Sequence, residues 1–262
     1  MRTAVITGAS SGIGEATARK LGGEGWRLLL VARRQDRLDA LASELPDASS
    51  VAVDLTDDDA PERVAAAVDE RLGGRLELLV NNAGSSKRAR FGDDDGGYAT
   101  VRRIMEVNFD AVVRLTERLL PVLRSSAPSS IVNVASMAGR VAYPRGGAYS
   151  ASKFALIGWG EALQQEEAEH GVHVGVVLPG FVTTEGFPQT DLTGSAATRW
   201  LVGRPDEVAG AIVRAGPGGA LEVAVPRKYR SVPVLRALSP GLTRRITGQF
   251  GKGSDVGEDA KR

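Results

Sequence analysis

The chain contains no cysteine, which excludes disulfide bonds, thiolate nucleophiles and cysteine-ligated metal sites. The two histidines flank Gly171 without a third ligand nearby, so we predict no metal site. The formal net charge is only +1, which gives no global electrostatic argument for nucleic-acid binding. The chain lacks an apolar run of about 18 residues, the length that would suggest a membrane span. Its first residues already read as a strand, so we expect no signal peptide and a cytoplasmic location.

Short apolar runs alternate with helical patterns along a chain of 262 residues that is 42% hydrophobic. Runs such as Leu28–Val31 and Val174–Leu178 are apolar throughout, as expected for strands buried on both faces of a parallel sheet. The pattern predicts an α/β fold in which helices cover both faces of a doubly wound parallel sheet of about seven strands. The candidate strands are Ala4–Ile6, Arg27–Val31, Ser50–Val53, Leu76–Val80, Ser130–Ala135, Val172–Leu178 and Leu221–Val225.

Several polar or small residues follow the predicted strands directly. In such sheets, ligands bind beyond the carboxyl ends of the strands. We therefore expect these residues to meet at one edge of the sheet: Gly8, Arg33, Asp54, Asn82, Ser136 and Pro179.

A glycine-rich turn lies between the first strand and a helical pattern at Ile13–Leu21. Gly8 permits a tight turn, and Gly12 and Gly14 would let a pyrophosphate approach the backbone and the helix N-terminus. The glycines are spaced as TGxxxGxG. The alternative is an ordinary strand-to-helix turn, because the chain has 32 glycines.

Tyr149 and Lys153 stand four residues apart, a spacing that places both on one face of a helix. An ammonium about 4 Å from a phenol could lower the tyrosine pKa by up to about three units. We predict that Tyr149 acts as a general acid or base near neutral pH. The pair alone is a weak signal, because many unrelated chains contain it.

In their joint order and spacing these motifs resemble the short-chain dehydrogenase/reductase family, in its compact branch of ~250 residues. The resemblance runs from Thr3 to about Val225 and implies one Rossmann-like catalytic domain over residues 1–225. It also implies an NAD(P)(H)-dependent oxidoreductase that interconverts a carbonyl and a secondary alcohol by hydride transfer. The motifs are Thr7–Gly14, Asp54, Asn81–Gly84, Asn108, Ser136, Tyr149–Lys153 and Pro179–Thr183.

The resemblance assigns four catalytic residues. Tyr149 exchanges the proton, and Lys153 lowers the Tyr149 pKa and bonds the nicotinamide ribose. Ser136 orients the substrate oxygen, and Asn108, in a helical stretch at Val107–Leu120, anchors a water that leads protons to solvent. The cofactor residues that it implies are Thr7, Gly8, Ser10, Ser11, Gly12, Ile13, Gly14, Arg33, Asp54, Leu55, Asn81, Asn82, Ala83, Gly84, Tyr149, Lys153, Pro179, Gly180, Val182 and Thr183.

The end of the second strand bears on the choice between NADP and NAD. An acid here favours a free ribose 2′-hydroxyl and an arginine a 2′-phosphate. Ala32 stands where the acid would be and Arg33 follows, so we predict a preference for NADP(H), with NAD(H) as the alternative. The family often has a basic residue in the glycine turn, whereas this chain has Ser10 and Ser11. Alternatively, Arg33 and Arg34 only begin a solvated helix.

The C-terminal third carries features that the motifs do not cover. We expect a substrate lid near residues 184–203, whose composition does not name the substrate, and a disordered tail at 251–262. Residues 226–250 form a basic amphipathic extension that fits two short helices broken at 239–241. It would cap the substrate cleft or contact a subunit; the sharper alternative is peripheral attachment to an anionic membrane. The resemblance further implies a homodimer or homotetramer paired through helices near 100–125 and 149–170.

Two other function classes remain as alternatives to a dehydrogenase. Epimerases and dehydratases use the same Tyr and Lys, but they generally have a different glycine spacing and a larger substrate domain. A catalytically silent dinucleotide-binding scaffold or sensor would be expected to lose Ser136, Tyr149 or Lys153, and this chain keeps all three.

Overall fold

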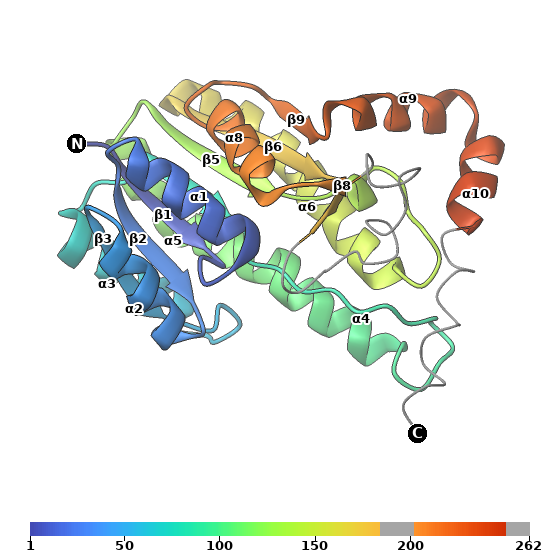
Figure 1. Cartoon of the computed structure of the whole chain (residues 1–262), viewed down its shortest axis with the longest axis horizontal. Coiled ribbons are helices and arrows are strands. Elements are labelled where there is room, and N and C mark those ends of the chain that lie inside the picture. The colour runs from blue at the N-terminus through green and yellow to red at the C-terminus, as the bar shows by residue number, and fades with distance from the viewer. Residues whose placement is uncertain (184–201, 250–262) are drawn as a thin grey trace.

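The computed structural model describes residues 1–183 and 202–249. Among these residues, seven strands form one parallel sheet in the order β3-β2-β1-β4-β5-β6-β9 (Figure 1). The arrangement confirms the predicted Rossmann-like α/β fold. The strands are β1 (Thr3–Thr7), β2 (Arg27–Ala32), β3 (Ala48–Ala52), β4 (Leu78–Asn81), β5 (Ser129–Val134), β6 (Val172–Pro179) and β9 (Glu222–Val225).

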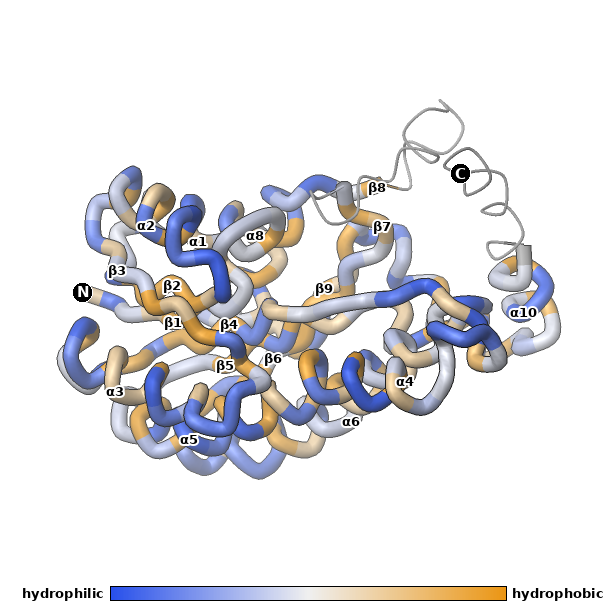
Figure 2. Tube along the Cα trace, turned by 90° about the horizontal axis from the view of Figure 1, so that it is seen from below, coloured by the Kyte–Doolittle hydropathy of each residue, from blue (hydrophilic) through white to orange (hydrophobic). Residues whose placement is uncertain are grey.

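Helices cover both faces of this sheet, as Figure 2 shows from below. One layer contains α1 (Gly12–Gly23), α2 (Gln35–Glu44) and α8 (Pro205–Ala215). The other contains α3 (Ala60–Leu72), α5 (Ala111–Ser125) and α6 (Gly147–Glu167), which continues as a short 3-10 turn at Ala168–His170.

The apolar strands form these layers because successive side chains point to opposite faces. Ala4 and Ile6 of β1 pack in the core between the sheet and helices α1 and α8. Val5 packs in the core on the opposite face, between the sheet and helices α3 and α5. Each central strand therefore needs an apolar residue at almost every position, and β1 and β4 are buried throughout.

One long helical segment leads to the site through a local irregularity. The short helix α4 (Tyr98–Met105) continues into a π-helical turn at Glu106–Asp110 before α5 begins. Such a turn holds one extra residue and is found often at functional sites. Here it contains Asn108, which is completely buried.

Two short strands follow β6, one before the predicted lid and one at its end. A small parallel pair, β7 (Phe181–Val182) and β8 (Val202–Gly203), follows Pro179 and precedes α8. The predicted lid lies outside the described residues except for β8, and the predicted tail lies wholly outside them.

The chain beyond β9 forms a 3-10 turn at Arg227–Arg230, then α9 (Ser231–Leu238) and α10 (Pro240–Gln249). The two predicted short helices are confirmed, with the break at Ser239. None of the helices in residues 1–183 and 202–249 is long and apolar enough to cross a bilayer.

Candidate active site

The glycine turn after β1 is packed so closely that Gly8 and Gly14 leave no room for a side chain. Gly8 and Gly12 have φ angles of 67° and 59°, in the region that favours glycine. A Cβ at Gly14 would lie 2.2 Å from the Gly8 carbonyl oxygen. The first turn of α1 therefore packs directly on the preceding loop, which leaves its N-terminus bare toward the sheet edge.

Thr7 and Asn82 join this turn to the turn after β4. The Thr7 hydroxyl accepts hydrogen bonds from the backbone N–H groups of Asn82 at 2.9 Å and Ala83 at 3.0 Å. The Asn82 amide donates to the Thr7 carbonyl at 2.8 Å. These bonds join the two turns into one wall beside the glycine loop.

Asn81 is the member of the predicted set whose side chain does not reach this edge. It is buried and donates to Thr116 Oγ1 at 3.1 Å and to Asn133 Oδ1 at 3.0 Å. The side chain therefore ties β4 to β5 and α5, and only the Asn81 backbone lies at the edge.

Arg33 and Asp54 lie together past the ends of β2 and β3. Arg33 Nη1 is 3.6 Å from Asp54 Oδ2, and the arginine side chain is 77% exposed. Thr56 donates to Asp54 Oδ1 through its backbone N–H at 3.1 Å and its hydroxyl at 2.8 Å. Partial burial acts to raise the Asp54 pKa, but these hydrogen bonds and the charge of Arg33 outweigh it and lower the pKa. Asp54 is therefore a fixed, ionised acceptor.

Arg34 makes a contact with the glycine turn that no sequence motif indicates. Its guanidinium donates to the hydroxyls of Ser10 and Ser11, both at 3.0 Å. A basic group is thus supplied to the glycine turn from the β2–α2 connection, although the turn itself has only serines. Neighbouring residues of an extended segment point in opposite directions, which lets Arg33 face Asp54 and Arg34 face the turn.

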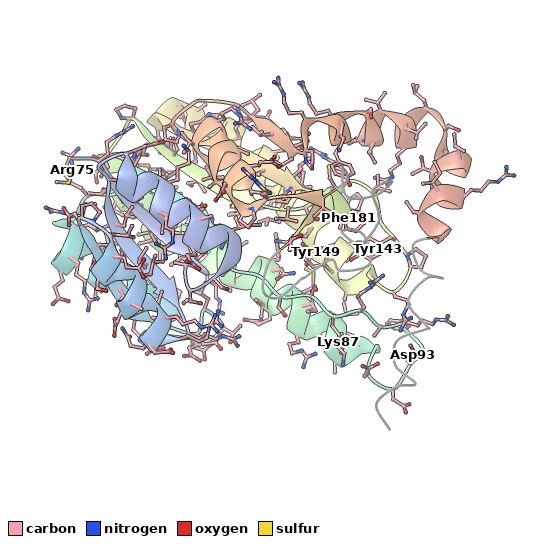
Figure 3. The ribbon with its side chains drawn as sticks, viewed as in Figure 1. Arg75, Lys87, Asp93, Tyr143, Tyr149 and Phe181 are labelled. Carbon is pink, nitrogen blue, oxygen red and sulfur yellow. The ribbon has the colours of Figure 1, made fainter. Side chains whose placement is uncertain are left out.

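Ser136, Tyr149 and Lys153 meet at the ends of β5 and α6, as predicted. Lys153 Nζ donates to the Val134 carbonyl at 2.9 Å and lies 5.8 Å from the centre of the Tyr149 ring. Ser136 Oγ accepts from the Ala138 N–H at 3.1 Å, and a hydrogen bond links Ser136 with the Tyr149 hydroxyl. Figure 3 shows Tyr149 near Tyr143 and Phe181, on the side of the sheet that faces α9 and α10.

The pKa values of this pair differ from the sequence prediction. Burial lowers the pKa of Lys153 to about 8. Burial also raises the pKa of Tyr149 to about 12; the Ser136 hydrogen bond opposes this rise, and Tyr143 adds to it. The net shift of the Tyr149 pKa is therefore upward, opposite to the net lowering that the sequence predicts, and a lowering by Lys153 stays a prediction. Loss of hydration on burial disfavours the charged form of both groups, and the spacing of an ammonium and a phenol along a helix does not reveal it.

Asn108 is held by three hydrogen bonds within the π-helical turn. Its Oδ1 accepts from the Ser85 N–H at 2.8 Å, and its Nδ2 donates to the Ser85 carbonyl and to Ser152 Oγ, both at 2.9 Å. A Cβ at Gly84 would lie 3.3 Å from Asn108 Oδ1 and 3.7 Å from Lys153 Nζ. Asn108 therefore fixes the turn beside Lys153. The contacts to Ser85 and Ser152 had no signal in the sequence, because they join three distant segments.

The segment after β6 completes the edge. The Gly180 N–H donates to the Val225 carbonyl at 2.7 Å, and the Thr183 N–H donates to the Gly203 carbonyl at 3.3 Å. A Cβ at Gly180 would lie 2.4 Å from the Tyr229 ring. These contacts hold the segment that contains Pro179, Val182 and Thr183. Its first residue lies beside Ser136, whose hydroxyl donates to the Pro179 carbonyl at 3.3 Å.

Comparison with known proteins agrees with this geometry. Residues 2–193 match the family model described as short chain dehydrogenase. The chain is 33% identical to the ketoacyl reductase HetN of Nostoc sp., over 86% of this chain and 78% of the relative. It is 32% identical to dehydrogenase/reductase SDR family member 7B of Bos taurus, over 92% and 79% of the two chains.

A solved structure extends the similarity to the fold. The short-chain dehydrogenase from Streptomyces avermitilis is 30% identical and superposes with a TM-score of 0.77. The match covers 97% of this chain and 99% of the other.

Proposed function

Because the chain belongs to the short-chain dehydrogenase/reductase family, and is thus an oxidoreductase that acts on CH–OH and C=O groups with NAD(P)(H), we propose that it prefers NADP(H) and that Tyr149 is its general acid and base. The observation that carries the proposal is the meeting of Ser136, Tyr149 and Lys153 with the bare glycine turn at one edge of the sheet.

The glycine turn fits a dinucleotide. A side chain at Gly8 or Gly14 would collide with backbone atoms of the neighbouring turns, so this surface is kept free of side chains. The N-terminus of α1, which begins at Gly12, has no side-chain cap. Backbone N–H groups and the positive end of the helix can then receive a pyrophosphate.

Two arginines support a preference for the 2′-phosphate. Arg33 stands beside Asp54, which we propose accepts a hydrogen bond from the adenine amino group, and Arg34 stands beside Ser10 and Ser11. Ala32 offers no carboxylate to a free 2′-hydroxyl. One charge-assisted contact contributes about 1.5–3 kcal/mol, which corresponds to a preference of roughly ten- to a hundredfold.

The bound nicotinamide supplies or accepts the hydride, and the chain's own residues manage the proton. A tyrosine with a pKa of about 12 is protonated at neutral pH, so Tyr149 is ready to donate its proton to the oxygen of a carbonyl substrate. Ser136 shares the hydrogen bond with that oxygen and holds it in place. The phenolate left on Tyr149 is stabilised by the neighbouring ammonium of Lys153, whose pKa of about 8 lets it pass on a proton.

A panel of carbonyl compounds tests the proposal, with NADPH consumption followed at 340 nm. We expect Tyr149→Phe to lower kcat by about 10²–10⁴-fold, the usual size of general acid–base catalysis. Tyr98→Phe, at a residue 73% exposed and outside the site, is the matched control. Full turnover in Tyr149→Phe would contradict the assignment. NADPH binding without turnover on any carbonyl or alcohol would favour the silent scaffold instead.

We also propose a cytoplasmic homodimer or homotetramer that acts on a small carbonyl or alcohol. The helices expected to pair the subunits are present as α5 and α6. Light scattering on the purified chain measures its mass, and a monomer would contradict the assembly.

A further inference from the structure

The C-terminal arm, residues 226–249, carries charge of one sign only. It contains six basic residues and no acidic one. Four of them, Arg227, Arg230, Arg244 and Arg245, are exposed and form no ion pair with any residue in the described part of the chain. In the rest of the described chain many surface arginines are matched by carboxylates, as Arg114 is by Asp58 and Glu106, although Arg90 and Arg103 are not.

The arm also exposes apolar side chains. Those of Leu238, Val234 and Leu242 are 81%, 57% and 47% exposed, and Ile246 and Leu235 follow at 43% and 36%. Four large apolar side chains are exposed in the rest of the described chain, so the arm holds five of nine. The spacings 234/238 and 242/246 place successive members on one face of each helix.

These exposures belong to an arm that is fixed to the domain. Arg236 donates to the Arg140 carbonyl at 2.6 Å, and its guanidinium lies 4.9 Å from the centre of the Phe154 ring. The Tyr229 ring packs against Gly180 at the base of the arm. Figure 1 shows α9 and α10 extending from the end of β9 along one side of the molecule. With the arm held in this way, Val232 packs against the core, whereas Val234, Leu235, Leu238, Leu242 and Ile246 stay exposed.

We propose that the C-terminal arm binds the surface of membranes rich in anionic lipid. The apolar side chains of α9 and α10 would enter the acyl boundary while the arginines meet the headgroup phosphates, as in interfacial amphipathic helices. Anionic headgroups supply the negative charge that no residue in the described part of the chain places beside these arginines.

Charge argues against a second copy as the occupant. A two-fold contact between two arms would set the same basic surface against itself. The exposed acids Asp93 and Asp94 of another copy could in principle receive an arm, so the test includes the mass of the protein. The sequence first suggests that the arm covers the substrate cleft. In that position its apolar side chains would be buried, whereas they are exposed in this structure.

Vesicle sedimentation of the full chain tests the proposal. We expect binding to phosphatidylcholine vesicles that also contain phosphatidylglycerol, weak binding to pure phosphatidylcholine, and loss of binding as salt is raised. A basic residue near an anionic surface contributes about fivefold, so the double variant R244Q/R245Q should bind about 25-fold more weakly. Leu238→Ser should lower binding about tenfold.

Leu221→Ser is the matched control. Leu221 is 57% exposed and precedes β9, at the opposite end of that strand from the arm, so its loss should leave binding unchanged. No sedimentation with anionic vesicles at low salt would overturn the proposal. So would arm-dependent dimers in light scattering without vesicle binding, or an equal loss in Leu221→Ser and Leu238→Ser. Vesicle binding does not depend on catalytic activity, so this experiment tests the membrane proposal separately from the proposed reaction.

Discussion

Burial of the Lys153 ammonium should make the stability of the fold depend on pH. Folding lowers the Lys153 pKa from 10.5 to about 8, because the amine loses its hydration. Between these values the unfolded chain binds more protons than the folded chain, so the free energy of unfolding rises with pH. The destabilisation is complete below about pH 8 and absent above about pH 10.5.

The size of this effect follows from the two pKa values. The fall from 10.5 to about 8 corresponds to about 3 kcal/mol when the lysine is fully charged. From pH 7.5 to pH 9.5, about 2 kcal/mol of that should be recovered. Lys153→Met keeps an unbranched side chain without a charge, and thereby removes this component of the pH dependence.

Urea unfolding at pH 7.5 and pH 9.5 measures the difference. The free energy of unfolding of the wild type should gain about 2 kcal/mol more over this interval than that of Lys153→Met. Loss of the hydrogen bond to Val134 shifts the variant equally at both pH values, so it does not enter the comparison. Lys20→Met, at an exposed lysine paired with Glu24, should follow the wild type. Parallel pH dependence of the wild type and Lys153→Met would refute the reasoning.

Three further substitutions probe the glycine turn, the π-helical turn and the ion pair between Arg124 and Glu167. Gly14→Ala places a Cβ 2.2 Å from the Gly8 carbonyl oxygen. The variant should lose about 1–3 kcal/mol of unfolding free energy in urea and should no longer bind NADPH. Intact NADPH binding would contradict the proposed role of the glycine turn. Asn108→Leu removes three hydrogen bonds from the π-helical turn. The free energy of unfolding in urea should fall by about 2–4 kcal/mol. An unchanged free energy of unfolding would contradict the role of Asn108 in fixing this turn. The Arg124 hydrogen bonds lower the Glu167 pKa, so the pair stabilises the fold above the unfolded pKa and loses this effect on acidification. Because Arg124 is 41% exposed, Glu167→Gln should cost about 1 kcal/mol at pH 7, and urea unfolding should show the gap closing below about pH 4.

The fold followed closely from the sequence because its signals are local. Every predicted strand is present, and its ends differ from the observed ones by no more than two residues. A continuous apolar run such as Leu28–Val31 has few alternatives to a strand buried on both faces. The π-helical turn around Asn108 was not foreseen, because its extra residue depends on contacts with the distant Ser85 and Ser152.

The convergence of the predicted site residues at one sheet edge was easier to predict than their pKa values. Ser136, Tyr149 and Lys153 converge as their positions after β5 and on α6 required. Their pKa values were not accessible, since burial depends on the packing of several segments. The contact of Arg34 with the glycine turn likewise depends on how the β2–α2 connection bends, which no sequence pattern encodes.

The most direct test of the proposed function is a fluorescence titration of the purified chain with NADPH and, in parallel, NADH. The account predicts that NADPH binds at least about tenfold more tightly, the size of one charge-assisted contact. It also predicts that Arg33→Ala and Arg34→Ala each lose this advantage while NADH affinity stays unchanged. Equal or tighter binding of NADH by the wild type would contradict the NADP(H) preference, and binding of neither cofactor would contradict the proposed dinucleotide site itself.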